Sequence, residues 1–178
     1  MREIFKLFAV IFGLIVMVCG QLLTTYLSPR PFDNFNVIFF ILILYLIFRE
    51  SGLVVYLSLA AHFTVELYTI TPFGIVLYAS TISFLVGYWL YRSVFTNKSW
   101  YSAIILSFMM VGFFRLLYLV MVWVGGYASV GTTQLMLGSF AYEAIFTSCA
   151  VGLVVFVSSR LSFRLSPSVL NKRLFRPK

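Results

Sequence analysis

The chain has 178 residues and a net charge of +8 at pH 7; 62% of its residues are hydrophobic and 10% are charged. An average soluble domain carries about 25% charged residues, so this composition excludes a disordered chain and argues against a water-soluble globule. All 23 residues between Lys6 and Arg30 are uncharged, and about 18 apolar residues suffice for a helix to cross a bilayer. The chain is therefore expected to lie in a membrane.

Six membrane-spanning helices are expected in chain order, at about 5–27, 36–49, 52–70, 73–93, 101–125 and 135–160. The second is short, because about 14 residues rise only about 21 Å. It must thin the bilayer locally, use Asn34 and Asn36 as interface anchors, or cross incompletely. The expected fold class is all-α, a polytopic membrane protein with a single bundle of about six transmembrane helices over residues 1–163. A basic cytoplasmic tail follows over residues 164–178.

A turn is expected between the third and fourth helices, where the sequence reads TPFG at 71–74. Proline at a helix start and a nearby glycine favour a tight reversal of the chain. We therefore predict a helical hairpin in which Pro72 and Gly74 are the turn residues.

Basic residues are concentrated at alternate helix ends. If the N-terminus is cytoplasmic, eleven Lys and Arg residues fall on the cytoplasmic side and only Arg30 on the other, while Arg115 lies within a span. An excess of Lys and Arg marks cytoplasmic loops, so both termini are expected in the cytoplasm. Lipid headgroups, rather than nucleic acid, are the expected partners of these residues, and an acidic protein partner is the alternative for the tail. The tail contributes Arg164, Lys172, Arg173, Arg176 and Lys178.

Four ionisable side chains fall inside the predicted spans: His62, Glu66, Arg115 and Glu143. A charge at the helix centre costs roughly 2.5–3.5 kcal/mol on insertion scales, so each must face protein or water. At about 1.5 Å per residue from the outer helix ends, Glu66 lies roughly 7 Å deep, Glu143 roughly 12 Å and Arg115 roughly 15 Å. The matching depths predict an ion pair between Arg115 and Glu143. Glu66 is a second candidate acceptor for the arginine. His62 lies four residues before Glu66, so the two side chains are on the same helix face and within reach of each other.

Three interpretations of these charges stay open at this point. In the favoured interpretation, the charges hold the helices of the bundle together. In the second they line a polar cavity for a solute or proton, and in the third they form a docking surface for another protein's helix. One histidine without clustered cysteines does not make an ordinary zinc site, so neither a metal nor a cofactor is expected. An enzyme is not expected either, because nothing completes His62 and Glu66 as a catalytic set.

The order of short motifs in the central region is informative. A short apolar span ends in the pair RE at 49–50, the next ends at Glu66, the TPFG turn follows, and a further span closes with YR at 91–92. The last span holds YEA at 142–144. Over about residues 36–160 this order resembles the bacterial rod shape-determining MreD family, with its acidic residue shortly before a T-P-[LF]-G-like turn. That acid is usually aspartate, whereas this chain has glutamate.

The resemblance implies a non-enzymatic subunit of the cell-elongation machinery in the bacterial cytoplasmic membrane. It would maintain cell shape by scaffolding peptidoglycan synthesis with an MreC-like protein, an MreB-like cytoskeleton, a RodA-like glycosyltransferase and a penicillin-binding protein. The family is also similar in fold to the substrate-binding subunits of energy-coupling-factor vitamin transporters, which supplies the alternative function. That alternative predicts an outward-facing pocket lined by Glu66, Arg115, Glu143 and the loop 125–134.

Overall fold

The computed structural model of the protein describes residues 2–29, 32–69, 72–95, 99–127 and 130–165. Within these ranges the chain is all-α, which confirms the expected class. A single 3-10 turn, η1 (Phe32–Asn34), interrupts the series of α-helices. The helices are α1 (Arg2–Leu27), α2 (Val37–Arg49), α3 (Leu53–Glu66), α4 (Ile75–Ser93), α5 (Trp100–Val124) and α6 (Val130–Leu165).

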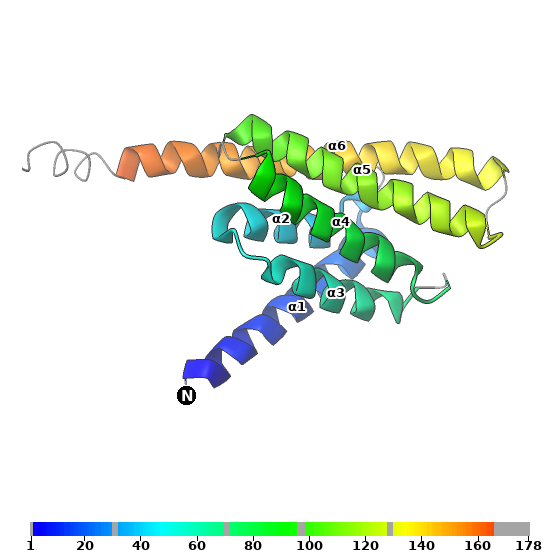
Figure 1. Ribbon diagram of the computed structural model, residues 1–178, viewed down its shortest axis with the longest axis horizontal. Coiled ribbons are helices and arrows are strands. Elements are labelled where there is room, and N and C mark those ends of the chain that lie inside the picture. The colour runs from blue at the N-terminus through cyan, green and yellow to red at the C-terminus, as the bar shows by residue number, and fades with distance from the viewer. Residues whose placement is uncertain (1, 30–31, 70–71, 96–98, 128–129, 166–178) are drawn as a thin grey trace, which may run out of the picture.

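The long helices α5 and α6 lie antiparallel, side by side along the longest axis of the molecule (Figure 1). The helix α4 packs on α5, and α3 packs on α4 in the antiparallel hairpin that the TPFG turn predicts. The Ser83 hydroxyl donates to the backbone oxygen of Met110 over 2.7 Å, which ties α4 to α5. The helix α1 crosses the bundle obliquely, and its N-terminal half points away from the other helices (Figure 1).

The centre of the bundle is the short helix α2, which contacts α1, α3, α5 and α6. Its sequence VIFFILILYLIFR has no charged residue before its last position, so every face can be buried. Phe39 packs against Phe84 of α4 and Phe114 of α5, with ring centroids 4.7 and 4.9 Å apart. The hydrophobic core of the protein is therefore built around a helix of 13 residues.

Three of the described helices are long and apolar enough to cross a membrane, in the segments Val10–Leu27, Trp100–Val124 and Met136–Arg160. The helices α2 and α3 are apolar but shorter, as expected for the second span but not for the third. Large apolar side chains also cover the outside of the helices, for example Phe12 and Trp89, which are 69% and 64% exposed. Soluble proteins rarely show extensive apolar surface of this kind, so the fold supports a multi-pass membrane protein.

The largest differences from the expected helix bounds are in the third and sixth helices. The third helix ends at Glu66 rather than near residue 70, because the amide and hydroxyl of Thr69 both bond back to the Glu66 carbonyl and form a turn. The sixth helix is longer than expected and covers Val130–Leu165. Gly74 has φ +102° and precedes α4, a backbone conformation that suits glycine. Pro72 and Gly74 both lie before α4, in the connection where the turn was predicted.

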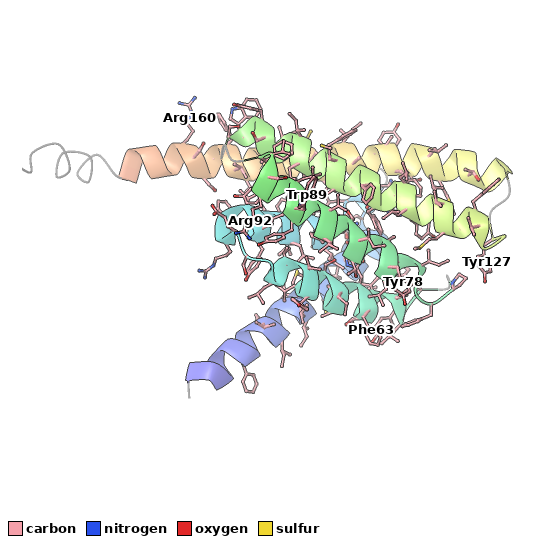
Figure 2. All side chains as sticks on the ribbon, in the orientation of Figure 1. Phe63, Tyr78, Trp89, Arg92, Tyr127 and Arg160 are labelled. Atoms are coloured by element: carbon pink, nitrogen blue, oxygen red, sulfur yellow. The ribbon has the colours of Figure 1, made fainter. Side chains whose placement is uncertain are left out.

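The described basic side chains outside the core lie toward one end of the bundle. Figure 2 shows Arg92 and Arg160 at the end opposite to Tyr78 and Tyr127, and Arg49 closes α2 next to the α2–α3 connection. Of the predicted basic tail, Arg164 falls on α6, which continues to Leu165. The remaining tail residues, Lys172, Arg173, Arg176 and Lys178, lie outside the described residues.

Candidate functional site

The predicted ion pair between Arg115 and Glu143 is confirmed. The Arg115 Nε donates to Glu143 Oε2, and the terminal Nη2 of the same guanidinium pairs with that oxygen. Glu143 is buried, whereas the Arg115 side chain is 26% exposed. The pair joins α5 to α6, and its mutual neutralisation allows both charges to lie inside an apolar bundle.

The other oxygen of Glu143 has a partner that the sequence did not indicate. Asn36 Nδ2 donates to Glu143 Oε1 over 2.7 Å. Asn36 also caps α2, since its Oδ1 accepts the backbone N–H of Phe39 over 3.0 Å. One amide group therefore connects the start of α2 to the ion pair, so that Glu143 holds three helices together. We call Asn36, Arg115 and Glu143 the polar lock.

Side chains of neighbouring helices accept hydrogen bonds from the backbone N–H groups at the start of α2. The backbone N–H of Asn36 donates to Thr147 Oγ1 of α6 over 3.4 Å, and the N–H of Val37 donates to Gln21 Oε1 of α1 over 2.8 Å. The first N–H groups of a helix have no partner within it. Here α1, α6 and the cap residue supply those partners.

Aromatic rings surround the arginine of the polar lock. The Arg115 Cζ lies 4.4 Å from the ring centroid of Phe140, 5.0 Å from Phe114 and 5.8 Å from Tyr118. A guanidinium is attracted to the negative face of such rings, most strongly where water is excluded. The rings therefore add to the stabilisation of the positive charge by Glu143.

His62 lies in the core, and within the described residues it makes no hydrogen bond to the polar lock. Its Nδ1 is 2.9 Å from the backbone oxygen of Ser58, and a carbonyl can only accept, so this nitrogen carries the proton. The ring packs against Phe39 and Phe114, with centroids 5.6 and 6.1 Å apart. Among the residues that the structure describes, no bond joins His62 to Glu66, although the two share a helix face as predicted.

Glu66 is the last residue of α3, whereas it was expected inside a helix that continues to about residue 70. Its Oε1 accepts the backbone N–H of Val76 over 3.0 Å, in the first turn of α4. Unpaired N–H groups and the helix dipole make that position favourable for a carboxylate. Within the described ranges it is not bonded to Arg115, so it is not the second acceptor of the guanidinium. Its Oε2 is buried without a hydrogen-bond partner.

The polar lock holds α2, α5 and α6 together. Both oxygens of Glu143 and both polar atoms of the Asn36 side chain are used inside the bundle. The described residues contain no group of three His, Cys, Asp or Glu side chains that could hold a metal ion. Asn36 was expected only as an interface anchor, and its position directly before an apolar run was the one available signal for its capping role.

Comparison of the chain with protein-family models, with curated proteins and with solved structures gave no match.

Proposed function

We propose that this chain is a non-enzymatic, multi-pass subunit of the bacterial cytoplasmic membrane that scaffolds peptidoglycan synthesis during cell elongation. Its partners are an MreC-like protein, an MreB-like cytoskeleton, a RodA-like glycosyltransferase and a penicillin-binding protein, by its resemblance to the MreD family. The observation that supports this proposal is the polar lock, in which the intramembrane charges meet one another inside the bundle.

A scaffold and a transporter subunit make different demands on buried polar groups. A substrate pocket needs convergent polar groups that are free to bind the ligand. Glu143 and Asn36 are instead saturated by contacts between α2, α5 and α6. Such saturation favours a rigid bundle that presents its outer faces to protein partners.

The proposed topology has six membrane-embedded helices with both termini in the cytoplasm. In support, Arg92 and Arg160 lie at one end of the bundle (Figure 2), and Arg49 ends α2. An excess of basic residues on one side indicates the cytoplasmic side. In a cysteine-free variant, a single cysteine at position 178 should react with an impermeant maleimide only after the membrane is opened. A cysteine at Gly126 should react in intact spheroplasts.

The substrate-binding subunit of an energy-coupling-factor vitamin transporter is the second candidate. Its specific support is Arg115, whose side chain is 26% exposed and keeps N–H groups beyond those bound to Glu143. An anionic solute could use them. A rise in melting temperature with one member of a panel of water-soluble vitamins would favour this candidate, and the scaffold function predicts none.

The direct test of the scaffold function is co-purification with the MreC-like protein from the same cells. The tagged wild-type chain should retain that protein in mild detergent, and depletion of the chain should make rod-shaped cells round. The variant Arg160→Gln, outside the core, serves as a matched control that should keep both properties. Retention of an ATPase and a coupling subunit instead, with normal cell shape after depletion, would contradict the proposal.

A further inference from the structure

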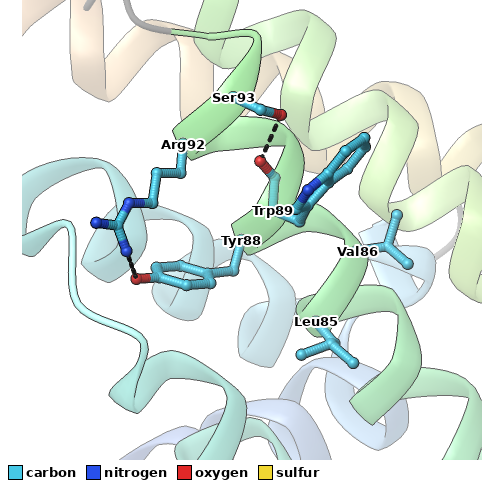
Figure 3. Close-up of a pocket in the computed structure, with 6 residues that line it drawn as sticks. All are labelled: Leu85, Val86, Tyr88, Trp89, Arg92 and Ser93. Carbon is cyan, nitrogen blue, oxygen red and sulfur yellow. Dashed lines mark hydrogen bonds between the residues drawn. The ribbon is translucent and has the colours of Figure 1, made fainter.

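The outer face of α4 carries a groove that the proposed function does not use. It has a volume of about 630 Å³ and is lined by Leu85, Val86, Tyr88, Trp89, Arg92 and Ser93. Figure 3 shows Tyr88 and Arg92 on one side of α4 and Trp89 and Val86 on the other. This volume is within the range of pockets that hold small-molecule ligands.

The groove is amphipathic along its length. Its polar groups, the Tyr88 hydroxyl, the Arg92 guanidinium and the Ser93 hydroxyl, lie toward the last turn of α4. Leu85 lies about two turns, or about 10 Å, before Arg92, so the other end is apolar. A ligand that fits this pattern has a polar head and an apolar chain of at least that length.

The guanidinium at the polar end has no anionic partner in the described part of the chain. Its hydrogen bond there is to the Tyr88 hydroxyl over 3.4 Å, and the ion pair of the described residues joins Arg115 to Glu143. Tyr88 lies beside the α2–α3 connection, since a Cβ on Gly52 would be 3.5 Å from its ring. Arg92 is exposed, and its guanidinium has further N–H groups that can donate to an anion.

The residues around Arg92 indicate which kind of anion it binds. Arg92 belongs to the end of the bundle where the described basic side chains lie, and Trp89 is the kind of residue that is enriched at the level of lipid headgroups. A phosphate accepts charge-assisted hydrogen bonds from a guanidinium, and basic pockets on the cytoplasmic side of membrane helices bind anionic lipid headgroups. A second copy of this chain in the same orientation would bring further positive charge to Arg92.

We propose that this groove is a binding site for one anionic phospholipid of the surrounding bilayer. The phosphate contacts Arg92 at the end of α4, and an acyl chain lies along Leu85, Val86 and Trp89. The bound lipid covers apolar side chains that are more than half exposed in the isolated protein, Trp89 at 64% and Leu85 at 56%.

The test measures how different lipids quench the fluorescence of Trp89. The full chain carries Trp100→Phe and Trp123→Phe, so that Trp89 is the one fluorophore of its kind, and is reconstituted in phosphatidylcholine vesicles. Dibrominated phosphatidylglycerol or dibrominated phosphatidylcholine is then added in rising fractions. We expect the anionic lipid to be preferred about fivefold, which corresponds to the about 1 kcal/mol that one arginine contributes near an anionic surface.

Variants of the basic residues separate a specific site from general surface charge. Arg92→Gln should reduce the preference to about one, whereas Arg92→Lys should keep most of it. Arg160→Gln is the matched control, because Arg160 lies over Phe156 with its Cζ 5.3 Å from the ring centroid and does not line the groove. It should leave the preference unchanged.

Three outcomes would overturn the proposal. One is equal quenching by the two lipids in the parent protein. Another is an anionic preference that survives Arg92→Gln or falls equally with Arg160→Gln. The third is protection of Trp89 from both lipids, which would indicate that a protein helix covers the groove. The result is independent of whether the chain binds an MreC-like partner.

Discussion

Asn36 and Glu143 are 107 positions apart in the chain, yet their side chains are joined by a hydrogen bond of 2.7 Å. Through this bond the N-terminal cap of α2 depends on a carboxylate of α6, which in turn neutralises Arg115 of α5. The start of the central helix and the intramembrane charge balance are therefore one structural unit.

Replacing Arg115 with Leu should destabilise the bundle by about 3–5 kcal/mol, because Glu143 would stay buried without its counter-charge. The measurement is the melting temperature of the purified protein in detergent. The double variant Arg115→Leu/Glu143→Leu removes both charges and should recover a large part of the loss. A single variant as stable as the wild type, with Glu143 still ionised, would contradict the role of the pair.

Substitutions of Asn36 should separate its two roles. Asn36→Ser keeps an N-cap oxygen but leaves Glu143 Oε1 without its donor, which costs about 1–3 kcal/mol. Asn36→Asp also keeps the cap and the shape, but it adds a negative charge beside Glu143, so it should be the more damaging change. Melting temperatures in detergent would show this order. If Asp is tolerated as well as Ser, the amide does not donate to Glu143.

Glu66 should matter as an acceptor at the start of α4. Glu66→Gln retains an oxygen for the Val76 N–H, so a small effect is expected, whereas Glu66→Leu leaves that N–H unpaired and should cost about 1–3 kcal/mol. Thermal unfolding of the two variants in the same detergent measures the difference. An equal loss for both would point to a need for the negative charge itself.

Gly152 should be intolerant of a side chain where α5 and α6 meet. A Cβ at this position would lie 2.3 Å from Ile104 Cγ1, and a β-branched residue in a helix cannot easily move aside. Gly152→Ala should therefore cost about 1–3 kcal/mol by overpacking. Gly138→Ala, on the same helix with nothing within 4 Å, should instead stabilise the protein by about 0.5–1 kcal/mol. A stability scan of both variants makes the comparison, and loss at Gly138 alone would refute it.

The ion pair was predictable because charge is scarce in this chain. With two acidic candidates inside the spans, depth along the helices was enough to select Glu143 as the partner of Arg115. The bounds of α2 were predictable for a related reason, since Asn36 and Arg49 flank an apolar run without charged residues. In both cases the surrounding sequence is apolar, so few other residues could form the ion pair or end the helix.

The roles of Asn36, Thr147 and Glu66 could not be read from the sequence. Asn36 and Thr147 are uncharged, so no neutralisation argument draws attention to them, and their pairing depends on how α2 and α6 pack. Glu66 was wrongly expected as a second acceptor for Arg115 because the third helix was predicted four residues too long. The helix was expected to reach residue 70, which would have kept the carboxylate on a helix face instead of at the end that meets α4.

The attachment of Asn36 to Glu143 also fixes how deep α2 begins. Glu143 lies roughly two turns, or about 10 Å, inside the apolar segment Met136–Arg160. A chain that starts a helix at that level meets hydrocarbon instead of water, and hydrocarbon can bind no amide hydrogen. Gln21, Thr147 and the Asn36 side chain take the place of the absent water for the opening amides. A helix of 13 residues can thus begin inside the protein, with its first amides bonded to side chains of α1, α6 and its own cap residue.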